Sequence, residues 1–101
     1  MSVTLQLQAG TCVVSISGNF TLEIHRPFRQ HSEEALDHPD CTQLDIDLSA
    51  VQYLDSSALG MLLLVKDKAT TLGKRVRLKG ATGNTLQILQ AVKFDGMFEL
   101  A

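Results

Sequence analysis

The sequence contains no tryptophan, and its aromatic residues are one Tyr and four Phe. It also lacks a basic cluster, because nine Lys and Arg residues are spread along the chain among eleven Asp and Glu residues. Proteins that bind single-stranded nucleic acids stack the bases on aromatic side chains, and nucleic-acid-binding domains generally present a basic stripe. The composition therefore argues against nucleic acid as a partner.

The sequence also lacks long apolar runs and closely spaced cysteines. The stretch over residues 58–65 is far too short to span a bilayer, and the first four residues lack the basic start and apolar run of a signal peptide. We therefore expect a cytoplasmic protein without direct membrane insertion. Cys12 and Cys41 lack CxxC spacing, so we expect free thiols in a reducing compartment.

What the sequence does contain is enough for one hydrophobic core. The chain has 101 residues, the size of one ordinary domain, and 45% of them are apolar. A domain of this size buries roughly 65% of the surface that its unfolded chain exposes, so it needs no metal or disulfide to fold. No linker, repeat or low-complexity tract interrupts the sequence. We predict a single domain over residues 1–101.

Alternation of apolar and polar residues predicts the strands. Residues 3–8 and 12–17 alternate on either side of the turn Ala9-Gly10 and predict a hairpin, which Gly18-Asn19 is expected to end. Residues 44–48 predict a central strand, and the apolar signal continues to residue 54. Short strands are expected over residues 76–78 and 97–100.

Helical spacing predicts three helices. The first covers residues 24–36, with Pro27 in its first turn and an end at His38-Pro39. The second begins at Asp55-Ser56-Ser57 and stops at Gly73, and the third follows Thr82, which can cap it. Two strands followed by alternating helices and strands require crossover connections. We therefore predict an α/β fold: a mixed, mostly parallel β-sheet with an N-terminal hairpin and three crossover helices packed on it.

The second helix carries more apolar surface than a single buried stripe needs. One stripe wide enough to cover the sheet consists of Ala58, Met61, Leu62, Val65, Ala69 and Leu72. Leu59 and Leu63 fall on one flank of this stripe and Leu64 falls on the other. These side chains either pack against neighbouring helices or form an exposed surface that binds a partner. Gly60 either lets another backbone come close or is simply tolerated.

The residues at the start of this helix, Asp55, Ser56 and Ser57, are all good caps. They either cap the helix and do nothing more, or they include a control point. The apolar surplus follows at once, and the turn lies at the carboxyl end of a strand, where open α/β sheets place their sites. The positive end of a helix dipole also accommodates a phosphate. The pattern therefore suits a phosphoserine switch beside a surface that binds a partner.

Residues 47–60, DLSAVQYLDSSALG, resemble the signature of the STAS domain, specifically of the bacterial anti-sigma factor antagonists. The family pattern is an apolar strand, then D-S-[ST]-[GA]-L-G, then an apolar helix. Gly18-Asn19-Phe20 is similar to the family's G-x-[LF] element, and residues 91–98 resemble its usual C-terminal end. The resemblance covers nearly the whole chain and implies the STAS fold.

This resemblance implies partner switching without a cofactor. The unphosphorylated antagonist binds an anti-sigma factor, which releases its sigma factor. A serine kinase, usually the anti-sigma factor itself, phosphorylates the antagonist and dissolves the complex, and a PP2C-type phosphatase restores it. By motif position Ser56 is the phosphorylated residue, Ser57 is a supporting cap, and Asp55 orients the hydroxyl or holds the turn. Thr21 stands where relatives often carry an acidic residue beside the site.

Other candidate sites have weaker support. His31 and His38 are seven residues apart, which does not fit an i,i+4 metal-binding pair, and His25 adds no ligand spacing, so we expect no metal site. Asp45 and Asp47 share one face of a strand, and paired carboxylates can perform acid–base chemistry. No nucleophile accompanies them, so we expect a solvated face.

Two other classes of function are the alternatives to the switch. Ser56 lacks a G-x-S-x-G elbow, and residues 80–84 lack the P-loop Lys, so we expect no enzymatic activity. The alternative to the switch is a structural STAS subunit of a membrane complex that transports lipids, which would bind its partner permanently. The serine after Asp55 favours the switch. The sequence leaves the oligomeric state open.

Overall fold

The computed structural model describes residues 2–101, which fold around one five-stranded sheet in the order β1-β2-β3-β4-β5. The strands are β1 (Ser2–Gln8), β2 (Thr11–Phe20), β3 (Gln43–Leu54), β4 (Arg75–Lys79) and β5 (Glu99–Leu100). The helices are α1 (His25–Asp37), α2 (Ser56–Thr71) and α3 (Gly83–Ala91), with short 3-10 helices η1 (Leu22–Ile24) and η2 (Phe94–Gly96). β1 pairs with β2 antiparallel and the other neighbours are parallel, so the predicted fold class is confirmed.

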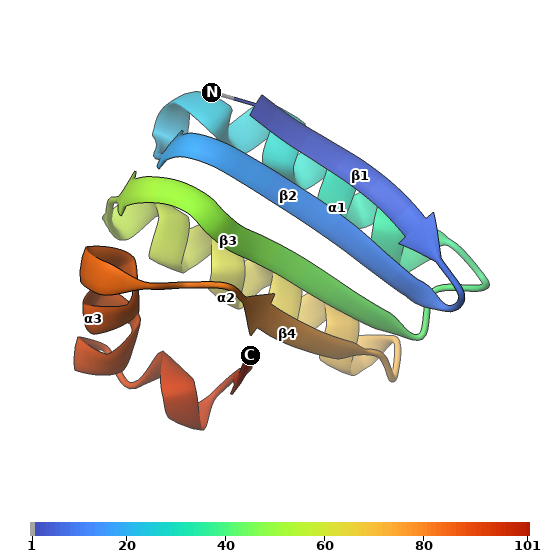
Figure 1. Cartoon of the computed structure of the whole chain (residues 1–101). Helices are drawn as coiled ribbons and strands as arrows, with labels where there is room; N and C mark the ends of the chain where they lie inside the picture. Colours follow the sequence, from blue (N-terminus) through green and yellow to red (C-terminus); the bar gives the residue numbers. More distant parts are fainter. Residues whose placement is uncertain (1) are drawn as a thin grey trace.

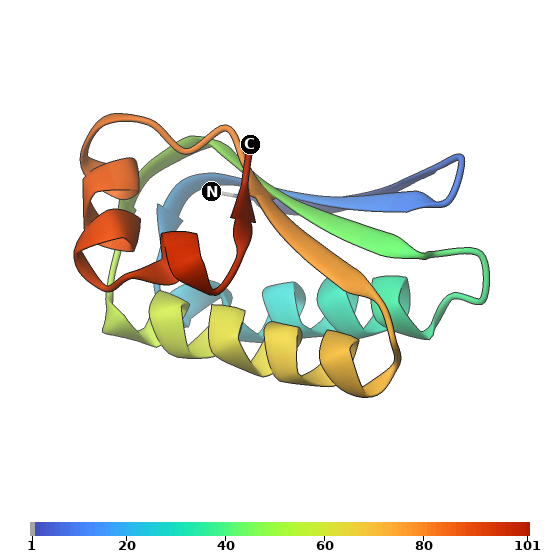
Figure 2. The same cartoon turned by 90° about the horizontal axis from the view of Figure 1, so that it is seen from below.

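Two helices cover one face of the sheet. Figures 1 and 2 show α1 and α2 side by side on this face, while α3 lies near the end of the sheet where β3 leads into α2. The inward side chains of β2 and β3 pack against both helices and form the core. On these two strands the largest fully buried side chains are Val14, Ile16, Phe20, Leu44, Ile46 and Leu48. Figure 2 shows that, within residues 2–101, the opposite face carries no helix.

The hairpin turn and the strand that follows it depend on backbone conformations with positive φ. Ala9 and Gly10 have φ of 47° and 88°, as a two-residue turn of the primed type requires. The prediction that Gly18-Asn19 ends β2 is wrong, because β2 runs on to Phe20. Gly18 has φ of 88°, and the pairing with β3 shifts between Gly18 and Asn19. Gly18 therefore bends the strand at an irregularity instead of ending it.

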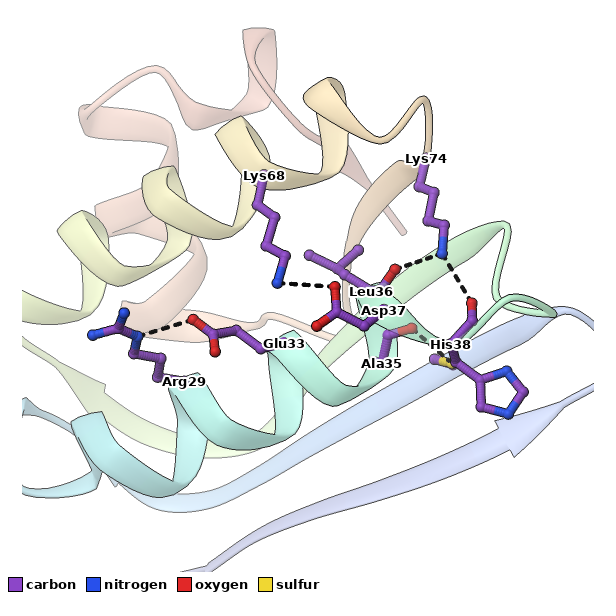
Figure 3. A network of polar contacts seen from close by, with 9 residues as sticks. Arg29, Glu33, Ala35, Leu36, Asp37, His38, Lys68 and Lys74 are labelled. Atoms are coloured by element: carbon purple, nitrogen blue, oxygen red, sulfur yellow. Dashed lines mark hydrogen bonds and ion pairs between the residues drawn. The ribbon is translucent and has the colours of Figure 1, made fainter.

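Helix α1 ends where the sequence predicts, and a lysine from another part of the chain completes that end. Pro27 lies in the first turn and the helix ends at Asp37. The Lys74 ammonium donates to the carbonyl oxygens of Leu36 and His38, as Figure 3 shows. The last carbonyls of a helix have no partner within the helix, so Lys74 supplies one for this end.

Three details of the predicted elements need correction. Leu72 is 45% exposed, because it follows the last residue of α2 and turns away from the buried stripe. Thr82 occupies the N-cap position of α3, but its hydroxyl makes no capping hydrogen bond. The last strand starts only at Glu99, because the chain first forms η2 and buries Phe98 against Phe94, with ring centroids 5.3 Å apart.

The predicted solvated face at Asp45 is also wrong. Asp45 is only 2% exposed, because Arg77 on β4 binds both of its carboxylate oxygens, at 3.1 and 2.6 Å. The Gln43 amide donates a third hydrogen bond at 2.7 Å. Burial raises the pKa of Asp45, but the hydrogen bonds from Arg77 and Gln43 outweigh it and hold this pKa below its usual value. Asp45 therefore forms a partly buried ion pair with Arg77 on the helix-free face.

Candidate functional site

The site is built where β2 and β3 end and α2 begins. Phe20 pairs with Leu54 in the parallel ladder, and the backbone N–H of Asp55 donates to the carbonyl oxygen of Phe20 at 3.2 Å. Thr21 follows directly on Phe20, so the fold places it beside the turn that carries Asp55 and Ser56. Thr21 is partly exposed and is the N-cap residue of η1, but its hydroxyl makes no capping hydrogen bond there.

Asp55 holds the turn at the start of α2. Its backbone is extended, and its carboxylate accepts a hydrogen bond from the Ala58 N–H at 3.0 Å. The first N–H groups of a helix have no acceptor within the helix, and the Asp55 carboxylate provides an acceptor for one of these groups. The carboxylate of Asp55 is therefore directed at the helix backbone, three residues ahead.

Ser56 is the first residue of α2 and is exposed, whereas Ser57 is half-buried. In the described part of the chain, neither serine hydroxyl has a hydrogen-bond partner. The capping role that the sequence offered to all three residues thus falls to Asp55 alone. This leaves the Ser56 hydroxyl accessible at the positive end of the helix dipole, where an anionic group is stabilised.

An exposed stripe extends from Ser56 along the outer face of α2. Gly60 and Leu64 follow at spacings of four and eight residues, so all three share one face of the helix. Leu64 is 66% exposed. A Cβ added to Gly60 would meet nothing within 4 Å, so no other part of the described chain approaches Gly60 closely. Together these three residues form an open surface, which we call the Ser56 stripe.

The other two predicted contact residues have a different environment. Leu59 and Leu63 are half-buried and pack against the core. The sequence left packing and partner binding open for both, and the structure shows packing with part of each side chain exposed. Lys66 lies on the same flank of α2 as Leu59 and Leu63, and its ammonium is 5.8 Å from the centre of the Phe98 ring.

Sequence reasoning missed two exposed apolar side chains at the same end of the sheet. Leu22 in η1 is 63% exposed and follows Thr21 directly, while Tyr53 near the end of β3 is also exposed. The sequence could have indicated Leu22, because this residue directly follows Thr21, which the resemblance places beside the site. Leu22 and Tyr53 add apolar surface near the start of α2.

Among residues 2–101, no group of three or more His, Cys, Asp and Glu is placed to hold a metal ion. No helix in this part of the chain has both the length and the apolar character to cross a membrane.

Sequence comparison adds independent findings. A family model described as "Mlab, STAS domain" matches residues 3–100. A STAS-domain containing protein from Pseudomonas aeruginosa (strain UCBPP-PA14) is 33% identical over 88 residues, which cover 87% of this chain and 85% of that protein.

Two solved structures share the fold at lower identity. The unphosphorylated form of the anti-sigma factor antagonist SpoIIAA has a TM-score of 0.79 and 16% identity, over 99% of this chain and 87% of that one. A sulfate transporter family protein from Wolinella succinogenes has a TM-score of 0.76 and 13% identity, over 91% of this chain and 74% of that one. At such identities the likeness shows the shared fold. The match to the family model and the Pseudomonas relative decide the family, and the chain belongs to the STAS domain family.

Proposed function

We propose that the chain is an anti-sigma factor antagonist that acts by phosphorylation-controlled partner switching. In its unphosphorylated form it binds an anti-sigma factor and frees a sigma factor, and phosphorylation of Ser56 abolishes this binding. The observation that carries the proposal is the exposed Ser56 hydroxyl at the head of α2, in line with exposed Gly60 and Leu64.

The position of Ser56 suits a phosphate that leaves the fold intact. Phosphorylation adds about −1.5 to −2 charges at neutral pH. At the first residue of α2 this charge meets the positive end of the helix dipole and the N–H groups that lack an acceptor. Ser56 is exposed and lies outside the core, and the capping hydrogen bond is made by Asp55. The domain therefore stays folded while its surface changes.

The same phosphate is incompatible with a partner that covers the Ser56 stripe. Such a partner would have to strip water from a nearly doubly charged group that lies next to the apolar contacts of Leu64. A penalty of about 4 kcal/mol weakens binding roughly a thousandfold. A single charged group can therefore act as a switch between two partners.

The partners follow from this mechanism. The anti-sigma factor, or a separate serine kinase, would transfer the phosphate, and a PP2C-type phosphatase would remove it, all in the cytoplasm. SpoIIAA, which has the same fold, has been solved in an unphosphorylated and a phosphorylated form. This supports a phosphorylated state for the present chain.

A second candidate function is a structural STAS subunit of a membrane transport complex, such as one that moves lipids. The fold shared with the Wolinella sulfate transporter family protein favours it. In that case the Ser56 stripe would bind its partner permanently, and Ser56 would carry no phosphate. The two functions therefore differ in whether the Ser56 hydroxyl becomes phosphorylated.

The test is a binding experiment with purified anti-sigma factors from the same genome. Wild type and Ser56→Ala should bind, Ser56→Glu should lose binding, and all three should give the same circular dichroism spectrum. Ser57→Glu is the matched control, because Ser57 is half-buried and lies off the stripe. Incubation with kinase and ATP, followed by phosphopeptide mapping, should locate the phosphate on Ser56. A phosphate on Ser56 that leaves binding unchanged would refute the switch.

A further inference from the structure

A groove between α1 and α2 lies outside the switch described above, although it shares Leu64 with the Ser56 stripe. Its volume is about 280 Å³. Its apolar lining consists of Phe28, Leu36, Met61, Leu64 and Val65. Its polar lining consists of His25, Arg29, Ser32, Glu33 and Lys68. An apolar groove with a few polar groups has the composition of a small-molecule site.

Ser32 is the unusual member of this lining. It lies on the inner side of α1 and is only 2% exposed. Within residues 2–101 its Oγ has no hydrogen-bond partner. Buried hydroxyls in folded proteins are nearly always hydrogen-bonded, so an unpaired one calls for an explanation. The serine χ1 angle has three staggered positions, so Oγ can turn toward a ligand without movement of the backbone.

An anionic ligand can use the two cations at the rim of the groove. Arg29 and Lys68 carry permanent positive charges, and each is paired with one carboxylate, Glu33 or Asp37. Figure 3 shows both cations in ion pairs at the rim, Arg29 with Glu33 at 3.0 Å and Lys68 with Asp37 at 3.1 Å. The side chains of these pairs are between 34% and 67% exposed, and solvent-exposed ion pairs are weak. A ligand carboxylate can therefore take the place of either acidic partner.

The volume sets the size of the ligand. It equals about nine water molecules at ~30 Å³ each, so the groove holds on the order of ten non-hydrogen atoms. We propose that the groove binds a medium-chain carboxylic acid. Its carboxylate would accept a hydrogen bond from the Ser32 hydroxyl and face Lys68 and Arg29, and its apolar chain would lie over Phe28 and Met61.

Octanoate, which has this size and charge, is the probe. It is titrated below its micelle concentration into the full chain, labelled with nitrogen-15, so that binding reports a free acid and not a membrane surface. We expect saturable chemical-shift changes in α1 and α2. Octylammonium, with the same chain and the opposite charge, should bind at least about tenfold more weakly.

Two variants test the residues that carry the inference. Ser32→Ala should weaken octanoate binding about tenfold, as the loss of one hydrogen bond to a charged group implies, without lowering Tm. Ser15→Ala, on the opposite face of the sheet, is its control. Lys68→Gln should remove most of the preference for octanoate over octylammonium, whereas Lys66→Gln, on the other flank of α2, should keep it.

Three results would overturn the proposal. One is the absence of saturable shifts, and another is shifts that map to the helix-free face of the sheet. The third is equal affinity of wild type and Ser32→Ala for octanoate. None of these results bears on the binding of an anti-sigma factor or on the phosphate at Ser56, so this inference and the proposed function stand or fall separately.

Discussion

Replacing Asp45 with Asn tests the partly buried ion pair on the helix-free face of the sheet. The substitution keeps the size of the side chain and removes the charge that accepts two hydrogen bonds from Arg77 and one from Gln43. Hydrogen bonds to charged groups contribute about 1.5–3 kcal/mol, and the amide oxygen of Asn retains part of this. We expect Asp45→Asn to lower the free energy of unfolding by about 2 kcal/mol at pH 7. The corresponding fall in Tm is roughly 8–16 °C.

The same substitution makes a prediction about pH. Burial raises the pKa of Asp45, but the hydrogen bonds from Arg77 and Gln43 lower it more, so its pKa in the folded state lies below the usual value. The ionised carboxylate therefore adds stability above its unfolded-state pKa of about 3.9, and this stability is lost as the pH falls through the folded-state pKa. The variant has no such group. The difference in unfolding free energy should be large at pH 7 and should shrink in acid.

Urea unfolding followed by circular dichroism, at neutral pH and at several acidic values, measures this difference. Asp47→Asn is the matched control, because Asp47 lies on the same face of β3 and accepts one backbone hydrogen bond, from Ser49 at 2.9 Å. Its loss of stability should be smaller. The reasoning would be refuted if both variants lost the same unfolding free energy. It would also be refuted if the difference in unfolding free energy between wild type and Asp45→Asn did not change with pH.

Three further predictions concern the helix head, the exposed stripe and the thiols. Asp55→Ala removes the cap of α2 and should cost about 1 kcal/mol, measured by thermal unfolding. Leu64→Asp should abolish anti-sigma factor binding in a pull-down without lowering Tm, whereas the same change at fully buried Leu62 should unfold the domain. Burial and the neighbouring Cys41 raise the pKa of Cys12 to about 12, so a disulfide reagent at pH 8 should modify Cys12 only after urea is added. Fast modification of Cys12 in the native state would contradict its burial.

Local patterns in the sequence predict most of the fold. Alternation over β1 and β3, the primed turn at Ala9-Gly10 and the cap signal at Asp55 are all short-range features. They could be read without knowing which elements become neighbours. The prediction for β2 was wrong at Gly18 because that strand continues only where β3 extends far enough to pair with it.

Features that depend on distant residues could not be predicted. Asp45 is buried by Arg77, which lies 32 positions along the chain and is brought alongside by parallel pairing. Helical spacing placed Leu63 and Leu64 on opposite flanks of α2, but it could not say how much of each side chain the neighbouring elements would cover. The groove with Ser32 needs the two helices to lie side by side, so no pattern within α1 alone reveals it.

The lysine that follows α2 has a consequence for how the helix layer can move. Lys74 joins the chain just after Gly73 to the last carbonyls of α1, so the carboxyl-terminal ends of both helices are tied to each other. At the amino-terminal end of α2, the Asp55 N–H binds the carbonyl oxygen of Phe20 on β2 and not a residue of α1. A separation of the two helices must therefore start beside Ser56, and amides in the first turns should exchange with deuterium sooner than those near Lys74.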